Sequence, residues 1–179
     1  MSRTGPRPLP LGAQAARLRQ LWGHGVTSYK RNTVTWRGTL QPSQFSPEYQ
    51  IRLQYREGHR PDVSVLQPSL QPKEGWLPHV YADSGNICLS LWYEWDASMY
   101  VAETTMPWAA EWLFFYELWL ATDEWLGGGD LQGEPRSLRN KREQVLPRPT
   151  NRHDTEQQSG FEQADSTSAG PMTFPKSAA

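Results

Sequence analysis

The sequence predicts an α+β domain in which helices pack against an antiparallel β-sheet. Three strand-like segments follow one another, separated by short turns that contain Pro, Ser or Gly, and an antiparallel meander is the simplest arrangement for them. A helical pattern precedes these segments, and a longer, Trp-rich helical pattern follows them. At 179 residues, the chain is long enough for one such domain with additional terminal segments.

A short N-terminal helix is expected within residues 12–25, because Ala15, Leu18 and Trp22 recur near one face and Gly23 provides a stop. Alternation of apolar and polar residues then predicts strands that bury one face. These three strands cover residues 33–40, 48–56 and 62–66.

An irregular Pro-rich stretch, residues 67–79, leads to the apolar run NICLSLW around Cys88, which is expected to be a strand or a loop. The long helix follows. Thr104 or Thr105 can cap it, Pro107 suits its first turn, and the glycines after Leu126 are expected to end it. Its aromatic residues recur at helical spacing and are expected to pack in the core and against the sheet. These are Trp108, Trp112, Phe115 or Tyr116, and Trp119.

Composition divides the chain into three parts. Residues 1–11 are rich in Pro and Gly and are expected to be flexible, and residues 12–130 form the predicted domain. From residue 131 to 179, a charge run is followed by polar sequence with few large apolar side chains. Such a segment buries too little apolar surface to fold, and it is predicted to be a disordered tail.

Net charge and the distribution of apolar residues argue against nucleic-acid-binding, membrane and secreted proteins. The formal net charge of -1 gives no electrostatic support for binding nucleic acid or an anionic membrane. The most apolar segment, residues 106–121, is interrupted by Glu111 and Glu117, which favours a helix of a soluble protein over a membrane span. The first 20 residues lack the apolar stretch of a secretory signal, so a cytoplasmic protein is expected.

Neither a cofactor nor a metal is expected. One cysteine excludes an intramolecular disulfide and a multi-cysteine zinc site. The glycines at 127–129 follow a helix instead of a strand, so they indicate a helix stop and not a dinucleotide or phosphate loop.

The single cysteine, Cys88, lies in the segment PHVYADSGNICLSLW between an isoleucine and a leucine. Two interpretations are open: an inert buried thiol, or a nucleophile held at the end of a strand. A thioester carrier needs a thiolate that attacks an acyl carbonyl and later leaves. Asp83, Glu94 and Asp96 flank the cysteine and are candidates for helping an amine lose its proton.

The order of these elements resembles the ubiquitin-conjugating (E2) fold. WRGTL lies on the first predicted strand, YQIRLQY on the second, and GNICLSLW follows a Pro/His segment. Gly85, Ile87, Cys88 and Leu89 match the family pattern G-x-[IL]-C-L at the catalytic thiol, and the layout covers residues 12–126 approximately. PHVYADSGNICLSLWYEW and the Trp-rich segment after it are similar in particular to the E2-like proteins of bacterial antiphage CBASS operons, of the short type II class.

The resemblance implies that Cys88 carries the C-terminal carboxyl group of a cGAS/DncV-like nucleotidyltransferase as a thioester and transfers it to an amine. The sequence has neither the length nor a G-x-G-x-x-G-type loop for an adenylating domain, so we expect an E1-like activating enzyme from another protein or a partner that arrives already acylated. The alternative is a catalytically inactive E2-like scaffold that binds the nucleotidyltransferase or a ubiquitin-like protein. A redox-sensing thiol is a third, weaker reading, because no resolving cysteine is present.

The sequence departs from the family in its His-Pro-Asn motif. Pro78 and His79 stand in that region, but the asparagine is absent and Val80 and Tyr81 follow. The role of the asparagine is therefore lost, or another donor such as His79, Asn86 or a backbone N–H takes it. His79 and Asn86 are the candidate catalytic residues beside Cys88, although each also suits a turn. Tyr81 is expected to be a packing residue with its hydroxyl at the surface.

Overall fold

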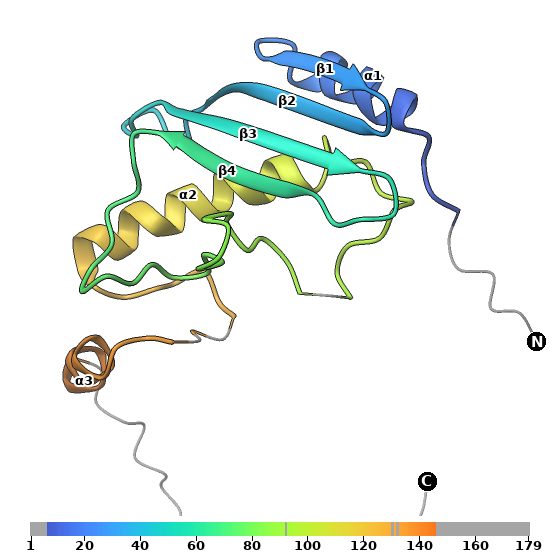
Figure 1. Cartoon of the computed structure of the whole chain (residues 1–179). Coiled ribbons are helices and arrows are strands. Elements are labelled where there is room, and N and C mark those ends of the chain that lie inside the picture. The colour runs from blue at the N-terminus through green and yellow to red at the C-terminus, as the bar shows by residue number, and fades with distance from the viewer. Residues whose placement is uncertain (1–6, 92, 130, 132, 146–179) are drawn as a thin grey trace, which may run out of the picture. The chain divides into compact units, whose positions relative to one another are not determined.

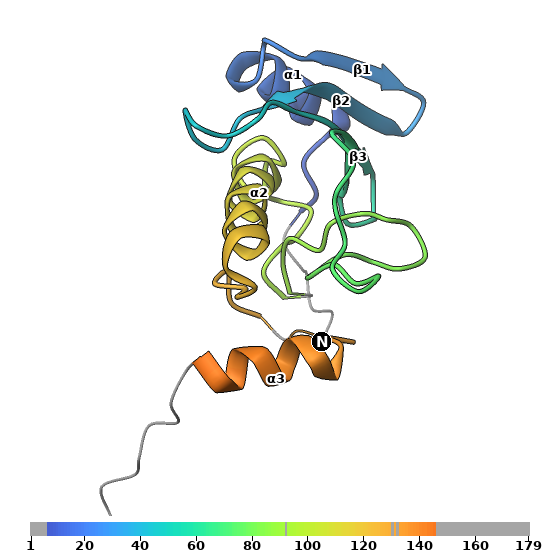
Figure 2. The ribbon, with the colours of Figure 1, turned by 90° about the vertical axis from the view of Figure 1, so that its left-hand side faces the viewer.

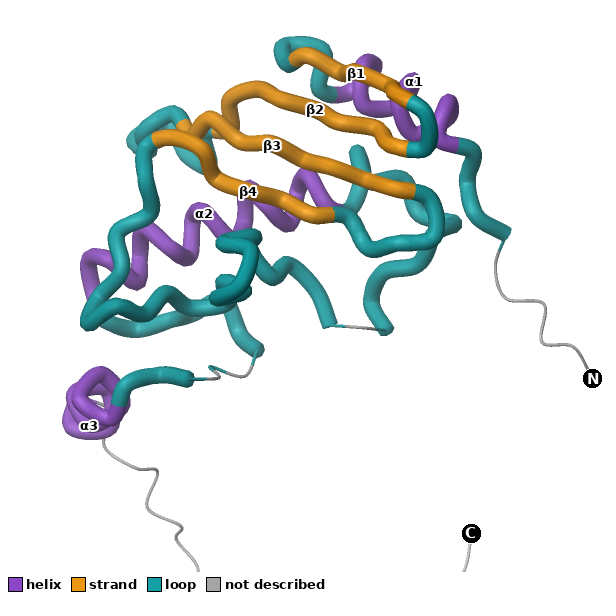
Figure 3. Tube along the Cα trace, in the orientation of Figure 1, coloured by secondary structure: helices purple, strands orange, loops and turns teal. Residues whose placement is uncertain are grey.

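The computed structural model describes residues 7–145 except 92, 130 and 132. Three helices and one four-stranded sheet make up the fold of these residues (Figure 1). In chain order the elements are α1 (Leu11–Leu21), β1 (Val26–Lys30), β2 (Thr33–Leu40), β3 (Tyr49–Arg56), β4 (Asp62–Gln67), α2 (Thr105–Thr122) and α3 (Arg136–Val145). A long irregular segment between β4 and α2, drawn as a teal tube in Figure 3, contains Cys88.

The sheet has the order β1-β2-β3-β4, and each neighbouring pair is antiparallel. The N-terminal helix and the antiparallel sheet confirm the α+β class predicted from the sequence. The sequence predicts three strands, whereas the sheet has four, because β1 pairs with β2 through a turn at Arg31 and Asn32. Most of β1 is exposed, Val26 at 73 % and Tyr29 at 51 %, so β1 lacks the half-buried alternation that marks the other strands.

The core lies between the sheet and α2, which covers one face of it (Figure 2). Alternate residues of β2 and β3 point to this face, as expected for strands with one buried side. From the sheet, the fully buried side chains include Val34, Trp36, Ile51, Leu53 and Tyr55, and from α2 they include Met106, Ala109 and Leu113. This packing places the start of the Cys88 segment at β4, the edge strand, with α2 behind it.

A buried glutamine fastens α1 to the segment before α2. Gln14 is 0 % exposed; its Nε2 donates to the Met99 carbonyl oxygen at 2.7 Å and its Oε1 accepts from the Val101 N–H at 3.0 Å. The Leu9 N–H donates to the Ala97 carbonyl oxygen at 2.8 Å. Ordered structure therefore begins before residue 12, where the sequence predicts that the domain starts, and Leu11 is already a buried residue of α1.

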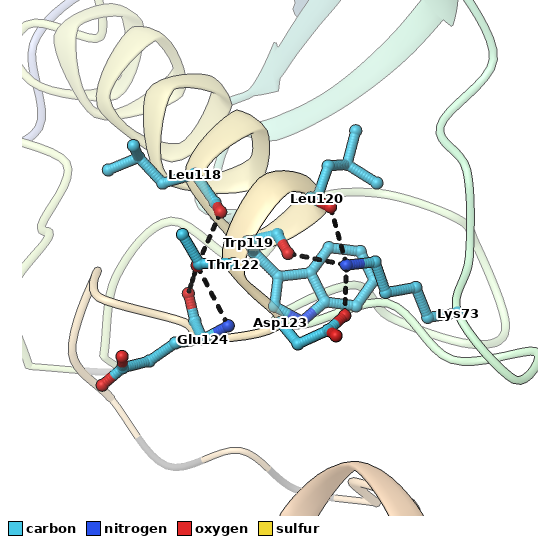
Figure 4. Close-up of polar contacts among 7 residues, drawn as sticks. All are labelled: Lys73, Leu118, Trp119, Leu120, Thr122, Asp123 and Glu124. Atoms are coloured by element: carbon cyan, nitrogen blue, oxygen red, sulfur yellow. Dashed lines mark hydrogen bonds and ion pairs between the residues drawn. The ribbon is translucent and has the colours of Figure 1, made fainter. Parts of the chain in front are cut away.

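Helix α2 ends earlier than the glycines predict. Its last residue is Thr122, and Asp123 adopts a left-handed conformation with φ of 63°. Aspartate tolerates this conformation better than most residues, so a helix can end there without glycine. Lys73 completes the end: its Nζ donates to the carbonyl oxygens of Trp119 and Leu120, both at 2.8 Å, and pairs with the Asp123 carboxylate (Figure 4).

Replacing Lys73 with methionine is expected to destabilise the fold by about 1–2 kcal/mol, because two carbonyl oxygens and the negative end of the helix dipole lose their cation. Lys73 also lowers the pKa of Asp123 through its hydrogen bond, so this contribution is present at neutral pH and is lost as the pH falls through the lowered pKa. Urea unfolding at pH 7 and at acid pH measures both effects. Lys30→Met, on the exposed edge strand, is the matched control, and an equal loss in both variants would contradict the assignment.

The segment predicted as a disordered tail contains one helix in the described residues. Helix α3 occupies Arg136–Val145, with Leu138 buried at 3 % exposure and Arg139 lying 3.8 Å from the Glu134 carboxylate. A hydrogen bond from Ser137 to Glu74 joins this helix to the Pro-rich segment. Residue 132 and residues 146–179 of the predicted tail lie outside the described residues. No described helix has the length and apolar character needed to cross a membrane.

Candidate functional site

A tight turn on the edge of the sheet holds Cys88. The Ile87 N–H donates to the Val63 carbonyl oxygen on β4 at 2.9 Å, and Ile87 also pairs antiparallel with Val80. One step further, the Cys88 N–H donates to the His79 carbonyl oxygen at 2.7 Å. Gly85, with φ of 69°, supplies the left-handed residue that the turn needs. Residues 79–88 thus fold back on themselves and place His79 directly opposite Cys88.

The Cys88 thiol is half-buried, and two side chains contact it. The Tyr81 hydroxyl donates to Cys88 Sγ at 3.2 Å. A hydrogen bond with His79 is the main cause that lowers the pKa of Cys88; the Tyr81 hydrogen bond and the positive charge of Arg60 act in the same direction. Burial opposes them, but the pKa of Cys88 remains below its ordinary value. These contacts therefore stabilise the thiolate form of Cys88 relative to that of a free thiol.

The loop after α2 orients the His79 ring. His79 Nε2 lies 3.1 Å from the Gly128 carbonyl oxygen, which also accepts from Trp125 Nε1 at 2.9 Å. A carbonyl oxygen only accepts, so Nε2 carries the hydrogen in the neutral ring and Nδ1 is an acceptor. Gly129 lies so close that a Cβ there would be 2.6 Å from His79 Cε1. Gly128 and Gly129, which the sequence predicted as a helix stop, instead pack against the histidine ring.

Arg60, which sequence reasoning missed, fixes the chain just after the cysteine. From the β3–β4 loop, its Nη2 donates to the Ser90 carbonyl oxygen and hydroxyl, both at 2.7 Å, and to the Leu91 carbonyl oxygen at 2.9 Å. These bonds hold the segment that continues from Cys88, and they bring a positive charge near the thiol. No sequence signal links Arg60 to Cys88, because only the meeting of two loops brings them together.

Asn86 belongs to the same turn but binds the sheet. Its Oδ1 accepts from the Ser64 hydroxyl at 2.6 Å, and Ser64 in turn accepts from Arg52 Nη2 at 3.1 Å. Its backbone carbonyl oxygen accepts from the Tyr81 N–H at 2.9 Å. These contacts anchor the turn to β3 and β4, so Asn86 contributes to the position of Cys88 through the backbone.

Tyr81 differs from its expected role. The sequence predicts a packing residue with its hydroxyl at the surface, whereas the residue is 46 % exposed and its hydroxyl donates to the thiol sulfur. Hydrogen bonding to Cys88 raises the pKa of Tyr81, so the phenol keeps its hydrogen for donation. The sequence carries no signal for this contact, because the Tyr81 backbone pairs with Asn86 in the turn and only the Tyr81 side chain extends to Cys88.

A pocket of about 390 Å³ opens beside the thiol. Cys88 and His79 line it from the sheet side, and one stripe of α2 lines it from the other. Of the three flanking carboxylates, the lining includes only Glu94, whose Oε2 accepts from the Leu91 N–H at 2.6 Å. Asp96 instead accepts from the Ser98 N–H at 2.7 Å, and Asp83 is exposed in the turn. The further lining residues are Leu89, Ser90, Leu91, Trp108, Glu111, Trp112, Phe115, Trp125 and Gly127–Gly129.

Comparison with protein families identifies one match. Residues 14–132 match a family described as E2-CBASS, type II CBASS E2 protein. The matched stretch is more than half of the chain, and it contains all four strands, the Cys88 turn and α2. A comparison with curated proteins found no match. Among the described residues, no group of three or more His, Cys, Asp and Glu side chains is arranged to hold a metal ion.

Proposed function

The chain belongs to the type II CBASS E2 protein family, and from this premise we propose that Cys88 carries the C-terminal carboxyl group of a partner protein as a thioester and passes it to an amine. The family assigns the chain an E2-like role in CBASS antiphage defence. The observation that carries the chemical proposal is the pairing of Cys88 with His79, which lowers the pKa of the thiol. A structural cysteine has no need of a lowered pKa, whereas a nucleophile does.

In the loading step, the thiolate of Cys88 attacks the activated carboxyl carbon of the partner, and the leaving group departs. His79 takes the thiol proton on Nδ1, since Nε2 is bonded to the Gly128 carbonyl oxygen. This arrangement has the three parts of an activated nucleophile: an attacking atom, a base and a group that orients the base.

A hydroxyl donor stands beside the reacting sulfur. The Cys88 N–H is engaged with the His79 carbonyl oxygen, so this backbone group is not free to stabilise an oxyanion. The Tyr81 hydroxyl, 3.2 Å from Sγ, can turn from the sulfur to the developing oxyanion once the sulfur is acylated and becomes a poorer acceptor. His79 follows Pro78 as asparagine follows proline in the His-Pro-Asn motif. We therefore assign the work of the missing asparagine to His79 and Tyr81 together.

The partner that fits the family is a cGAS/DncV-like nucleotidyltransferase, and its activation requires an E1-like enzyme or a pre-formed acyl donor from another protein. The test is to co-express the chain with the proteins encoded beside it and to separate them on a denaturing gel with and without reductant. We expect one shifted band that reductant removes, with an intact mass equal to the chain plus its partner minus one water. Co-purification of a partner without any shifted band would contradict the proposal and indicate an E2-like scaffold.

A further inference from the structure

We propose that the outer face of the sheet binds duplex nucleic acid through the phosphate backbone, without reading the base sequence. The outer face is the side of the sheet away from α2, and it carries Lys30, Arg37, Arg52 and Arg56 (Figure 2). The carrying observation is that no carboxylate of the described residues pairs with any of these four cations. The inference goes beyond the proposed function and does not depend on it.

The positive charge of the chain is concentrated near its N-terminus. All 19 acidic residues follow residue 47, whereas seven of the 18 basic residues precede it. These seven are Arg3, Arg7, Arg17, Arg19, Lys30, Arg31 and Arg37. The formal net charge of -1 therefore averages two parts of opposite sign and describes neither of them. Helix α1 and strands β1 and β2 belong to the positive part.

The strand register gathers positive side chains on the outer face. The buried residues of β2 and β3 alternate with residues that point to this face. Arg37 on β2 is the direct partner of Arg52 on β3, and Thr33 on β2 lies between Lys30 on β1 and Arg56 on β3. Neighbouring strands lie about 4.8 Å apart and rise about 3.4 Å per residue, so the Cα atoms of the four cations lie within about 16 Å of one another.

The described residues leave this charge without a counter-ion. Lys30 and Arg37 make no hydrogen bond or ion pair among the described residues. Like charges directly opposite each other destabilise a sheet, and Arg37 stands opposite Arg52, whose Nη2 donates to the uncharged Ser64 hydroxyl at 3.1 Å. An oxyanion bound by both guanidinium groups removes this repulsion. Asp62, which is the one carboxylate on the four described strands, lies at the β4 edge of the face.

The composition of the outer face fits phosphate better than it fits a protein surface. The two central strands contribute only arginine, threonine and glutamine to it: Thr33, Thr35, Arg37, Thr39, Gln50, Arg52, Gln54 and Arg56. A stable protein interface has an apolar core within a polar rim, and the centre of this face has no apolar side chain. All three residue types donate hydrogen bonds to phosphate oxygens, and protein–nucleic acid interfaces are polar and positively charged.

The same composition selects a duplex over a single strand. Single-strand sites stack bases on aromatic side chains, and β2 and β3 place none on the outer face. A duplex presents about one negative charge per 1.7 Å of its axis, so each of the four cations can meet a phosphate. Contacts to the backbone carry no sequence information, so we expect no sequence preference. Helices α1 and α2 pack into the core on the other side of the sheet, so a bound duplex leaves the α2 lining of the pocket uncovered.

Fluorescence anisotropy of a labelled DNA duplex of about 20 base pairs, titrated with the full chain at about 50–200 mM salt, measures this binding. We expect the logarithm of the association constant to fall linearly with the logarithm of the salt concentration, with a slope of about -3 to -4 for four phosphate contacts. Arg37→Gln is expected to weaken binding about tenfold at the lowest salt and to make the slope shallower by about one. Lys141→Gln, which removes the same charge from the exposed surface of α3, is the matched control.

A variant with tighter binding separates a lost contact from a misfolded chain. Asp62→Asn removes the negative charge from the outer face and is expected to strengthen duplex binding about threefold. No salt-dependent binding by the wild type, or an equal loss in Arg37→Gln and Lys141→Gln, would overturn the inference. Poly-glutamate bound more tightly than the duplex, with the same dependence on Arg37, would also overturn it and assign the face to an acidic protein. These outcomes do not require a thioester on Cys88, so they are independent of the proposed function.

Discussion

Cys88→Ala is expected to abolish every covalent adduct of the chain, and Cys88→Ser is expected to give an adduct that survives reductant. Alanine has no nucleophile, so loading stops completely. Serine forms an oxyester, which is far less reactive towards thiols and amines than a thioester, and this stops the cycle after loading. The difference between the two variants is therefore qualitative.

Both variants are expected to keep the fold. Cys88 is only half-buried, and the turn around it is held by backbone bonds that these substitutions leave in place. The free energy of unfolding of each variant, measured by thermal unfolding, should stay within about 1 kcal/mol of the wild-type value. Each variant should also still co-elute with the partner in size-exclusion chromatography. A reductant-sensitive adduct that persists in Cys88→Ala would contradict the assignment of Cys88. Intact defence activity in that variant would indicate a scaffold.

His79→Ala is expected to produce the second largest effect, a loss of about 10–100-fold in thiol reactivity at neutral pH. The reason is that the hydrogen bond with His79 is the main cause of the lowered pKa of Cys88. A thiol reacts as its thiolate, so the alkylation rate rises as the pH passes through the thiol pKa. Without His79 this pKa rises, and the midpoint of the pH–rate profile moves to higher pH.

The rate of alkylation of Cys88 by iodoacetamide between pH 5 and pH 10 measures this shift. Tyr81→Phe is expected to move the midpoint in the same direction by less, because its hydrogen bond is a smaller cause. His24→Ala, on the loop before β1, is the control. His79→Asn should retain more loading activity than His79→Ala, since asparagine tolerates the left-handed backbone at this position and offers a side-chain donor. A midpoint unchanged in His79→Ala would refute its role.

The fold was predictable to the extent that burial left a pattern in the sequence. Strands β2, β3 and β4 each bury alternate residues, and their alternation predicted them. Strand β1 is mostly exposed and gave no such pattern. The end of α2 depends on Lys73, whose ammonium reaches the last turn of the helix from the Pro-rich segment. That contact is tertiary, so local reading selected the glycines instead.

The residues of the candidate site also fall into two groups: those that the local sequence indicates, and those that only the packing of separate elements brings together. The motif around Cys88 predicted a nucleophile there, and His79 lies opposite Cys88 because the intervening turn is local. Arg60, from the β3–β4 loop, binds the segment that follows Cys88, and Glu111, from α2, lines the pocket. Neither residue carries a motif, since each depends on how separate elements pack. Gly128 and Gly129 read as a helix stop for the same reason, although they contact His79.

The most direct measurement of the central claim maps the covalent link itself. The wild-type adduct would be digested with pepsin at low pH, which preserves a thioester, and its peptides would be sequenced by tandem mass spectrometry. We expect a branched peptide in which the segment containing Cys88 is joined to the C-terminal peptide of the nucleotidyltransferase, with the summed mass minus one water. An unmodified Cys88 peptide, together with a link that maps to a lysine of this chain, would contradict the account.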